Sequence, residues 1–264
     1  MVIRVAVVGA SGRLGSLACT LIEQQSDLAL VARLDSRSDL GEMLGADVVL
    51  DVTAPGVSPT VVDHAVRAGL KVLVGTSGWS EERLRTLRGL VAQHPDAGVI
   101  VIPNFALGSV VATHLAAIAA RYFESIEIVE AHHAAKVDSP SGTAVRTAEL
   151  IGHARADLGP VVAPHTDQRA RGQQVASVPI HSLRLQGVVA RQEVHLGGTG
   201  EVVTITHETL SPSSYEAGIL LGLRAAAETT GLVVGLDSLL GLHLPGAVDA
   251  AADSGGAPAD GDAS

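Results

Sequence analysis

Short β-branched runs alternate with segments of helical periodicity over the first hundred residues of the chain. The expected strands are "IRVAVVG", "LALVARLD", "VVLDVT", "KVLVGT" and "GVIVIP". Between the first two strands, one helix face is marked by Leu14, Leu17, Ala18, Leu21 and Ile22. Two later helices are expected to begin at Ser58-Pro59 and at Ser80. Strands separated by helices in this way predict a parallel sheet that is covered by helices.

The pattern changes after Phe105, where a long apolar helix is expected. A strand "SIEIVEA", a polar turn and a helix from about Thr143 follow it. Three more strand-like stretches come in an order that favours antiparallel pairing, and they are "VPIHSLRLQG", "VVARQEVHLGG" and "EVVTITHE". This second block is expected to form an α+β domain with a mixed sheet.

The end of the chain predicts a return to the first domain and then a tail. A helix is expected from about Ser214 to Thr230, and "LVVGLDSLLGLHL" follows it. From Pro245 onward the residues are mostly small or acidic, so residues 245–264 are expected to be disordered. The length of 264 residues fits two modest domains.

Charge and composition exclude several classes of function. With 28 acidic and 18 basic side chains the net charge is -10. A negative surface repels nucleic acid and anionic lipid, so neither is an expected partner. Two Phe, two Tyr and one Trp leave little for base stacking. The first residues carry no secretory pattern and no apolar run has the length of a membrane span, so we expect a cytoplasmic protein. The single cysteine, Cys19, is expected to be a small buried residue.

A glycine-rich turn follows the first expected strand in "VAVVGASGRLG". Gly9, Gly12 and Gly15 would permit a tight turn and bring backbone N–H groups close to a pyrophosphate at the start of a helix. Asp35 ends the next strand, where a Rossmann fold places a carboxylate on the adenosine ribose. Arg37, with Arg13, could instead hold the 2′-phosphate of NADPH. The sequence therefore predicts a Rossmann-like domain that binds NADH or NADPH.

Two further loops, "GTSGW" at 75–79 and "PNFALG" at 103–108, also follow expected strands. They should lie at the same carboxyl edge of the sheet, where ligands of such folds bind. Trp79 and Phe105 in these loops fit either contact with a flat ring or burial as loop anchors.

The segment "AHHAAKVDSPSGTA" at 131–144 concentrates positive charge and hydrogen-bond donors. Lys136 supplies a mobile cation, and Ser141, Gly142 and Thr143 stand at the start of a helix, where free N–H groups and the dipole favour an anion. Together they suit a substrate that carries carboxylates.

His132 and His133 end a strand, so their side chains should point to opposite faces and only one is expected to reach a bound reactant. A histidine there could protonate the atom that becomes electron-rich after hydride arrives. A metal site using both histidines and Asp138 is the competing interpretation. It is disfavoured because adjacent strand residues diverge and no cysteine supports them, so no metal is expected.

These motifs resemble the 4-hydroxy-tetrahydrodipicolinate (dihydrodipicolinate) reductase family of bacterial lysine and diaminopimelate biosynthesis. The similarity rests on "GASGRLG", "GTSGW", "PNFALG" and above all "EAHHAAKVDSPSGTA", and it spans about residues 1–244. It implies that residues 1–106 with 215–244 bind NADH or NADPH. It also implies that residues 107–214 bind a cyclic dicarboxylate and build a homotetramer through their sheet.

The resemblance also implies roles for individual residues. His132 and Lys136 would be the catalytic pair, with either one giving the proton that follows the hydride. The substrate would be bound by His133, Lys136, Ser141, Gly142 and Thr143. The cofactor would be bound by Gly9, Ser11, Gly12, Arg13, Leu14, Asp35, Thr53, Gly75, Ser77, Asn104 and Phe105, to which the residues themselves add Arg37.

The chain departs from the family pattern at three places. Asp51-Val52-Thr53 stands where D-F-T is usual, and GTSG stands where GTTG is usual. Both changes keep a hydroxyl in place. Pro212 replaces a common arginine, which puts one interdomain or substrate contact in doubt.

Two other functions stay open on the sequence. One is a related dehydrogenase of a small amino acid, such as aspartate or homoserine, although such an enzyme would not be expected to carry the H-H-x-x-K and S-G-T pair. The other is a dinucleotide-sensing module, which would need Gly9 to Asp35 but would have no use for His132 and Lys136.

Overall fold

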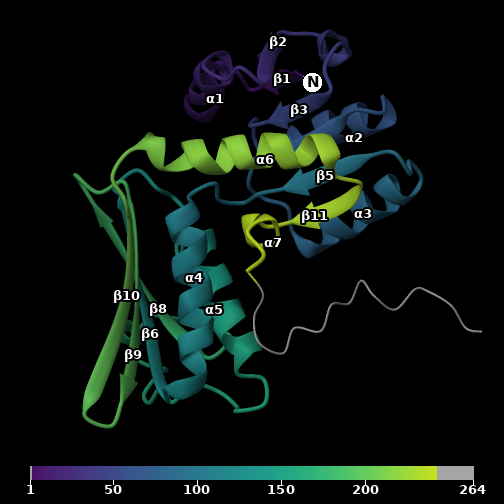
Figure 1. The fold of residues 1–264 in the computed structure, drawn as a ribbon. Coiled ribbons are helices and arrows are strands. Elements are labelled where there is room, and N and C mark those ends of the chain that lie inside the picture. The colour runs from purple at the N-terminus through teal and green to yellow at the C-terminus, as the bar shows by residue number, and fades with distance from the viewer. Residues whose placement is uncertain (1, 243–264) are drawn as a thin grey trace, which may run out of the picture.

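The computed structural model describes residues 2–242, which form two sheets joined by helices (Figure 1). The first sheet has the strand order β11-β5-β4-β3-β1-β2, and every neighbouring pair is parallel. Its strands are β1 (Ile3–Val8), β2 (Leu28–Leu34), β3 (Val48–Asp51), β4 (Lys71–Val74), β5 (Gly98–Val101) and β11 (Gly231–Val234). The predicted Rossmann-like sheet is confirmed, and the returning segment of the chain supplies β11.

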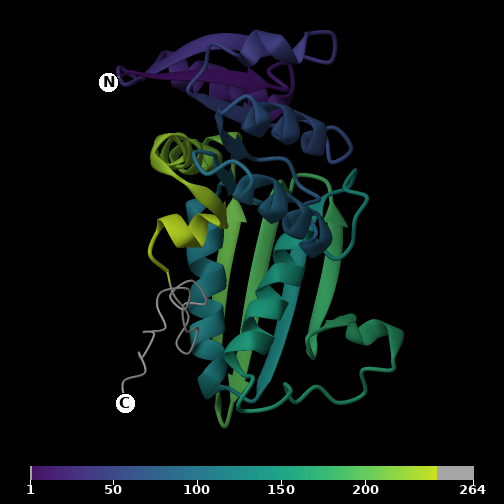
Figure 2. The same ribbon diagram turned by 90° about the vertical axis from the view of Figure 1, so that its right-hand side faces the viewer.

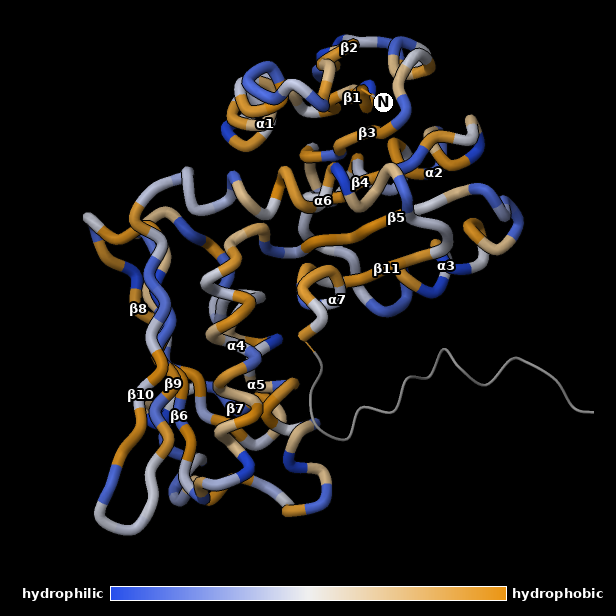
Figure 3. The backbone as a smooth tube through the Cα atoms, viewed as in Figure 1, coloured by the Kyte–Doolittle hydropathy of each residue, from blue (hydrophilic) through white to orange (hydrophobic). Residues whose placement is uncertain are grey.

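Helices cover both faces of this sheet, which is why its strands are continuously apolar (Figure 3). One face packs on α2 (Ser58–Arg67) and α3 (Glu81–Ala92). The other face packs on α1 (Arg13–Glu23) and α6 (Glu216–Glu228), and the short α7 (Leu236–Leu239) closes the same core. Cys19 is buried in that second cluster.

The second sheet is mixed and has the order β10-β9-β6-β8-β7. Its strands are β6 (Ser125–His133), β7 (Gln173–Val175), β8 (Val178–Leu185), β9 (Ala190–Gly198) and β10 (Glu201–Thr209). The helices α4 (Leu107–Ala119) and α5 (Gly142–Ala154) cover one face of it (Figure 2). Short 3-10 turns complete the chain at Leu40–Met43, Ala120–Tyr122, Arg169–Arg171 and Pro212–Tyr215.

The predicted pairing of the three late strands is wrong in one respect. β9 and β10 are antiparallel neighbours, but β6 lies between β8 and β9 and pairs with both, in parallel with β8. Residues 186–189 therefore cross the end of β6, and β6 gains a hydrogen-bonded partner strand on each edge. The short strand β7 was not predicted.

The inner face of the second sheet, toward α4 and α5, holds a separate core of small and aliphatic residues. Within residues 2–242, no α-helix covers the outer face (Figure 1). The predicted tail at 245–264 lies outside the described residues. Within residues 2–242, none of the helices has both the length and the apolar character that crossing a bilayer requires.

Candidate active site

A cleft of about 850 Å³ lies between the carboxyl edge of the first sheet and the upper end of the second. Most of the residues singled out in the sequence line it. From the first sheet they are Ser11, Gly12, Arg13, Leu14, Gly75, Asn104 and Phe105, and from the second they are His132, His133, Lys136, Ser141 and Thr143. The cleft thus brings the glycine turn and the charged segment together. Gly9, Asp35, Arg37, Thr53, Ser77 and Gly142 are outside its lining.

The glycine turn brings strand and helix unusually close. Gly9 has a φ of +90°, and a Cβ there would lie 2.6 Å from the carbonyl oxygen of Val52. A Cβ on Gly15 would lie 2.1 Å from the carbonyl oxygen of Gly9. No side chain caps α1 at Gly12, so its first N–H groups and its positive dipole end face the cleft. This arrangement fits the pyrophosphate of a dinucleotide.

Asp35 and Arg37 lie beyond the end of β2 and contact each other. The backbone N–H of Arg37 donates to Asp35 Oδ1 at 2.8 Å, and its guanidinium lies 3.4 Å from Asp35 Oδ2. These hydrogen bonds lower the pKa of Asp35, so it is an ionised acceptor at neutral pH. The Arg37 side chain is 89% exposed and is free to turn toward an added phosphate.

The buried Asp51 at the end of β3 organises the loops around the cofactor side. Thr53 donates to Asp51 Oδ1 from its hydroxyl at 2.6 Å, and Ser58 donates to the other oxygen. Trp79 in turn donates from Nε1 to the Ser58 hydroxyl at 3.1 Å. Thr53 and Trp79 therefore hold the loop geometry through Asp51.

Phe105 is also an anchor, because it is only 2% exposed and lies directly under Gly75. A Cβ on Gly75 would approach its ring to 2.4 Å. Of the two interpretations of these aromatic residues, the structure favours burial as loop anchors, although the edge of Phe105 reaches the cleft.

The start of α5 is built as the sequence predicts. Ser141 caps the helix by accepting from the Ala144 N–H at 3.2 Å, and the helix begins at Gly142. Lys136 Nζ lies 2.6 Å from both oxygens of Asp138, and this hydrogen bond lowers the pKa of Asp138. The ammonium group and the helix N-terminus border the same cleft.

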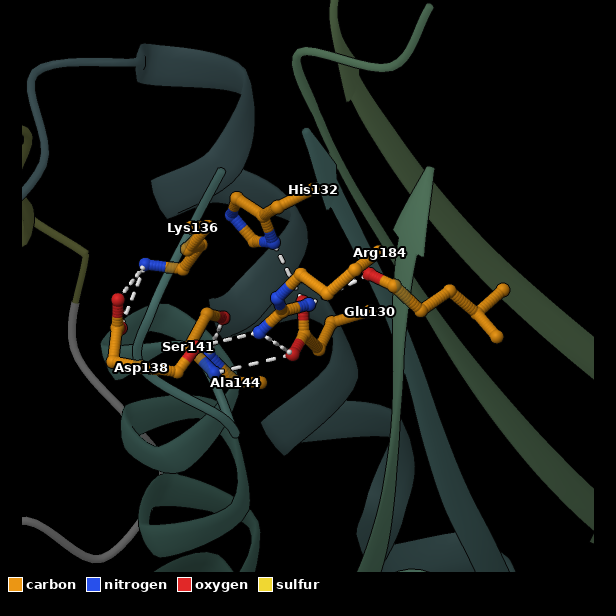
Figure 4. A network of polar contacts seen from close by, with 8 residues as sticks. Glu130, His132, Lys136, Asp138, Ser141, Ala144 and Arg184 are labelled. Carbon is orange, nitrogen blue, oxygen red and sulfur yellow. Dashed lines mark hydrogen bonds and ion pairs between the residues drawn. The ribbon is translucent and has the colours of Figure 1, made fainter. Parts of the chain in front are cut away.

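Both histidines line the cleft, and which of them reaches a bound reactant stays a prediction. His132 points to the inner face of β6, and His133, at the exposed end of the strand, also lines the cleft because the sheet ends there. Across residues 2–242 no cluster of three His, Cys, Asp or Glu side chains could hold a metal ion. His132 and Asp138 are instead engaged by Glu130 and Lys136 (Figure 4).

Glu130 is the residue next to His132 that the sequence analysis missed. It has no solvent exposure, and its Oε2 lies 2.5 Å from His132 Nδ1. Arg184 of β8 donates to both oxygens, at 3.0 and 2.9 Å (Figure 4). Burial raises the pKa of Glu130, but the hydrogen bonds from Arg184 and His132 outweigh it and leave that pKa below its usual value. Burial lowers the pKa of His132, against the opposing influence of Glu130.

Strands β9 and β10 and the segments beside them add residues that the sequence did not single out. The newly found lining residues are Val189, Ala190, Arg191, Gln192, His207, Thr209 and Tyr215. Burial lowers the pKa of His207. Pro212 borders the cleft, so the departure from the family pattern falls at the site itself. Only a strand-by-strand register, which the sequence does not supply, could have found this group.

Two family models together cover nearly the whole of the described chain. "Dihydrodipicolinate reductase, N-terminus" matches residues 3–105, and "Dihydrodipicolinate reductase, C-terminus" matches residues 108–240. A 4-hydroxy-tetrahydrodipicolinate reductase from Clavibacter michiganensis subsp. michiganensis is 58% identical, over 98% of this chain and 93% of that relative. One from Streptomyces griseus subsp. griseus is 47% identical, over 91% of this chain and 99% of that relative.

Among solved structures, a dipicolinate-bound dihydrodipicolinate reductase from Paenisporosarcina sp. has the same architecture. It superposes with a TM-score of 0.76 at 32% identity, over 90% of this chain and 99% of that chain. On the family models, the relatives and the fold, this chain belongs to the dihydrodipicolinate reductase family.

Proposed function

We propose that this protein reduces 4-hydroxy-tetrahydrodipicolinate to tetrahydrodipicolinate with NADH or NADPH, as a step in diaminopimelate and lysine biosynthesis. The observation that carries the proposal is the single cleft that joins the glycine turn of α1 to the charged segment at the end of β6. A reductase needs the cofactor side and the substrate side in one cleft, because the hydride donor and the hydride acceptor must be in contact. The names of the relatives supply the substrate.

The residues on the first sheet fit a nicotinamide dinucleotide. The uncapped N-terminus of α1 suits its pyrophosphate, and Asp35 suits its ribose hydroxyls. When bound, the reduced nicotinamide would supply the hydride. The exposed Arg37 would favour NADPH and the ionised Asp35 would favour NADH, so the chain is expected to use both.

On the other side of the cleft, the substrate carboxylates would be held by Lys136, His133 and the start of α5. There Ser141 would donate from its hydroxyl, and Gly142 and Thr143 would donate from their N–H groups. Exchange of the ring hydroxyl for hydrogen consumes one hydride and one proton and releases water. His132 and Lys136 both line the cleft, and both are therefore candidates to move that proton.

The proposal also includes the larger organisation of the protein. Residues 1–106 with 215–244 would act as the cofactor domain and residues 107–214 as the substrate domain. A homotetramer would form through the second sheet, whose outer face exposes Leu183, Leu185 and Val202. The enzyme would act in the cytoplasm.

The test is the oxidation of NADH and of NADPH, followed optically, with the condensation product of pyruvate and aspartate-semialdehyde generated in situ. Rapid oxidation of at least one cofactor is expected. Arg37→Ala should lower kcat/KM for NADPH by about tenfold relative to NADH, because one charged hydrogen bond to the phosphate is lost.

Failure to oxidise either cofactor, in protein that binds a dinucleotide, would refute the proposal. An aspartate or homoserine dehydrogenase would then act on its own amino acid. A sensing module would bind the dinucleotide equally well after replacement of His132 and Lys136 and would turn over no substrate.

A further inference from the structure

Glu130 sits at the centre of a buried polar cluster behind the cleft (Figure 4). Its buried carboxylate accepts from His132 Nδ1, from both terminal nitrogens of Arg184 and, at 3.3 Å, from the backbone N–H of Ser141. Burial of an unpaired carboxylate is costly, so these contacts stabilise one another as a unit. The cluster ties the histidine to the start of α5.

Arg184 extends the cluster to the loop that bears Lys136. Its Nη2 donates to the carbonyl oxygen of Asp138 at 2.6 Å, and its Nη1 donates to the carbonyl oxygen of Leu183. Asp138 in turn holds the ammonium group of Lys136. The Glu130–Arg184 pair therefore holds the backbone of the loop that carries Lys136 and Asp138.

The charge of Glu130 decides which nitrogen of His132 carries a proton. An ionised carboxylate can only accept hydrogen bonds, so Nδ1 of His132 must be the donor. The lone pair of a neutral imidazole is then on Nε2, at the far side of the ring from Glu130. Because burial lowers the pKa of His132, the ring is neutral at neutral pH.

We propose that Glu130, held by Arg184, is the positioning residue that makes His132 a proton acceptor with Nε2 directed to the cleft. His132 then takes a proton from the substrate ring as the hydroxyl leaves, with Lys136 supplying the proton that converts that hydroxyl to water. His132 returns its proton to the ring carbon after the hydride has been transferred. The two steps together consume one hydride and one proton and release one water.

Other charged groups face His132 and bear on its titration. Glu130 from the same strand favours the protonated ring, and Lys136 and Arg184 oppose it. The remaining ionisable side chains that line the cleft are Arg13 on α1, His133 on β6, Arg191 on β9, His207 on β10 and Tyr215 just before α6. Only Glu130 both contacts the ring and carries negative charge.

The first test does not depend on turnover. The full-length protein is labelled with ¹⁵N-histidine, and the signal of His132 is identified by its loss in His132→Asn. The Nδ1–H tautomer, neutral at a pH of about 7.5, is the expected result. The Nε2–H tautomer, or a ring protonated on both nitrogens at that pH, would overturn the proposal whatever the substrate.

The second test rests on the proposed reductase activity and uses Glu130→Gln. The amide no longer favours the protonated ring, so the acid limb of the kcat/KM profile should move to lower pH. The kcat should fall roughly ten- to a hundredfold because the tautomer is no longer fixed. Glu127→Gln is the matched control, since Glu127 contacts Arg171 and His181 on the other face of the same strand.

An unchanged acid limb and kcat in folded Glu130→Gln would contradict the proposal, and so would the same change in Glu127→Gln. If Glu130→Gln does not fold, Glu130→Gln with Arg184→Met removes both buried charges together. That variant should shift the acid limb in the same direction but by less, because Arg184, which opposes protonation of His132, is lost as well. Binding of NADH should be retained. Absence of activity in the wild type would instead refute the proposed function and leave the tautomer measurement to decide this inference.

Discussion

The two faces of β6 carry the same three kinds of side chain in different surroundings. On the outer face, Glu127 binds Arg171 at 2.5 Å and the Nε2 atom of His181 at 2.8 Å. These three residues, the outer triad, are about a quarter to a third exposed. None of them borders the cleft.

The inner triad consists of Glu130, Arg184 and His132, and it has nearly the same contact lengths. Its carboxylate is wholly buried, and its histidine lines the cleft beside Lys136. Residue types and contact distances therefore do not distinguish a structural triad from one that positions a catalytic histidine. Burial, the face of the strand and the neighbouring cleft make the difference.

The largest expected difference between the triads is in catalysis. His132→Asn should lower kcat about a hundred- to ten-thousandfold, because a positioned acid–base group is lost. His181→Asn should leave kcat within about twofold, when measured on protein of the same oligomeric state. Steady-state oxidation of NADH measures kcat for both variants. An equal loss of kcat in the two variants would contradict the assignment of catalysis to the inner triad.

Stability should separate the carboxylates next. Glu130→Ala leaves Arg184 buried and unpaired, so the free energy of unfolding should fall by about 3–5 kcal/mol. Glu127→Ala breaks a partly exposed pair and should cost less than about 1 kcal/mol. Urea unfolding followed by circular dichroism gives the two values, and a larger loss at Glu127 would reverse the assignment.

Lys136 extends the inner triad toward the substrate. Lys136→Ala should lower kcat/KM, because a desolvated substrate carboxylate loses its cation. The loss should correspond to about 2–4 kcal/mol of transition-state stabilisation. Lys71→Ala is the control, since Lys71 donates to the carbonyl oxygens of Asp96 and Thr229 in the first sheet. That variant should keep kcat/KM, and unchanged kinetics in Lys136→Ala would exclude its role.

The smallest expected effect is in the pH dependence of stability. Burial depresses the pKa of His132 and of His207 in the folded protein below the ordinary 6.5. The unfolded chain therefore binds more protons as pH falls below 6.5, and the free energy of unfolding should decrease there. His132→Asn should flatten part of this slope, and His181→Asn should not. A slope unchanged by His132→Asn, measured by urea unfolding across that pH range, would contradict the account.

Much of the fold could be predicted from local patterns. The strands of the first sheet are buried on both faces and therefore appear as apolar runs, and Gly9, Gly15 and Ser141 mark turns by their residue type. The position of β6 between β8 and β9 could not be predicted in this way. Strand order depends on pairing between distant segments, which the apolar pattern does not encode.

The site shows the same limit. His132, Lys136 and the start of α5 lie within one short segment, and the family resemblance marks them. Glu130 could have been found, because a residue two positions before His132 in a strand shares its face. Arg184 could not, since it lies 54 positions from Glu130 and meets it only through the register of β6 and β8.

The most direct test of the central claim is to follow the hydride itself. The wild-type protein is supplied with NADH deuterated at the transferable position of the nicotinamide and with the substrate generated in situ, and the cyclic product is analysed by mass spectrometry. The account predicts a product that carries one deuterium from the cofactor. Oxidation of NADH with no deuterium in the product, or no product at all, would contradict it.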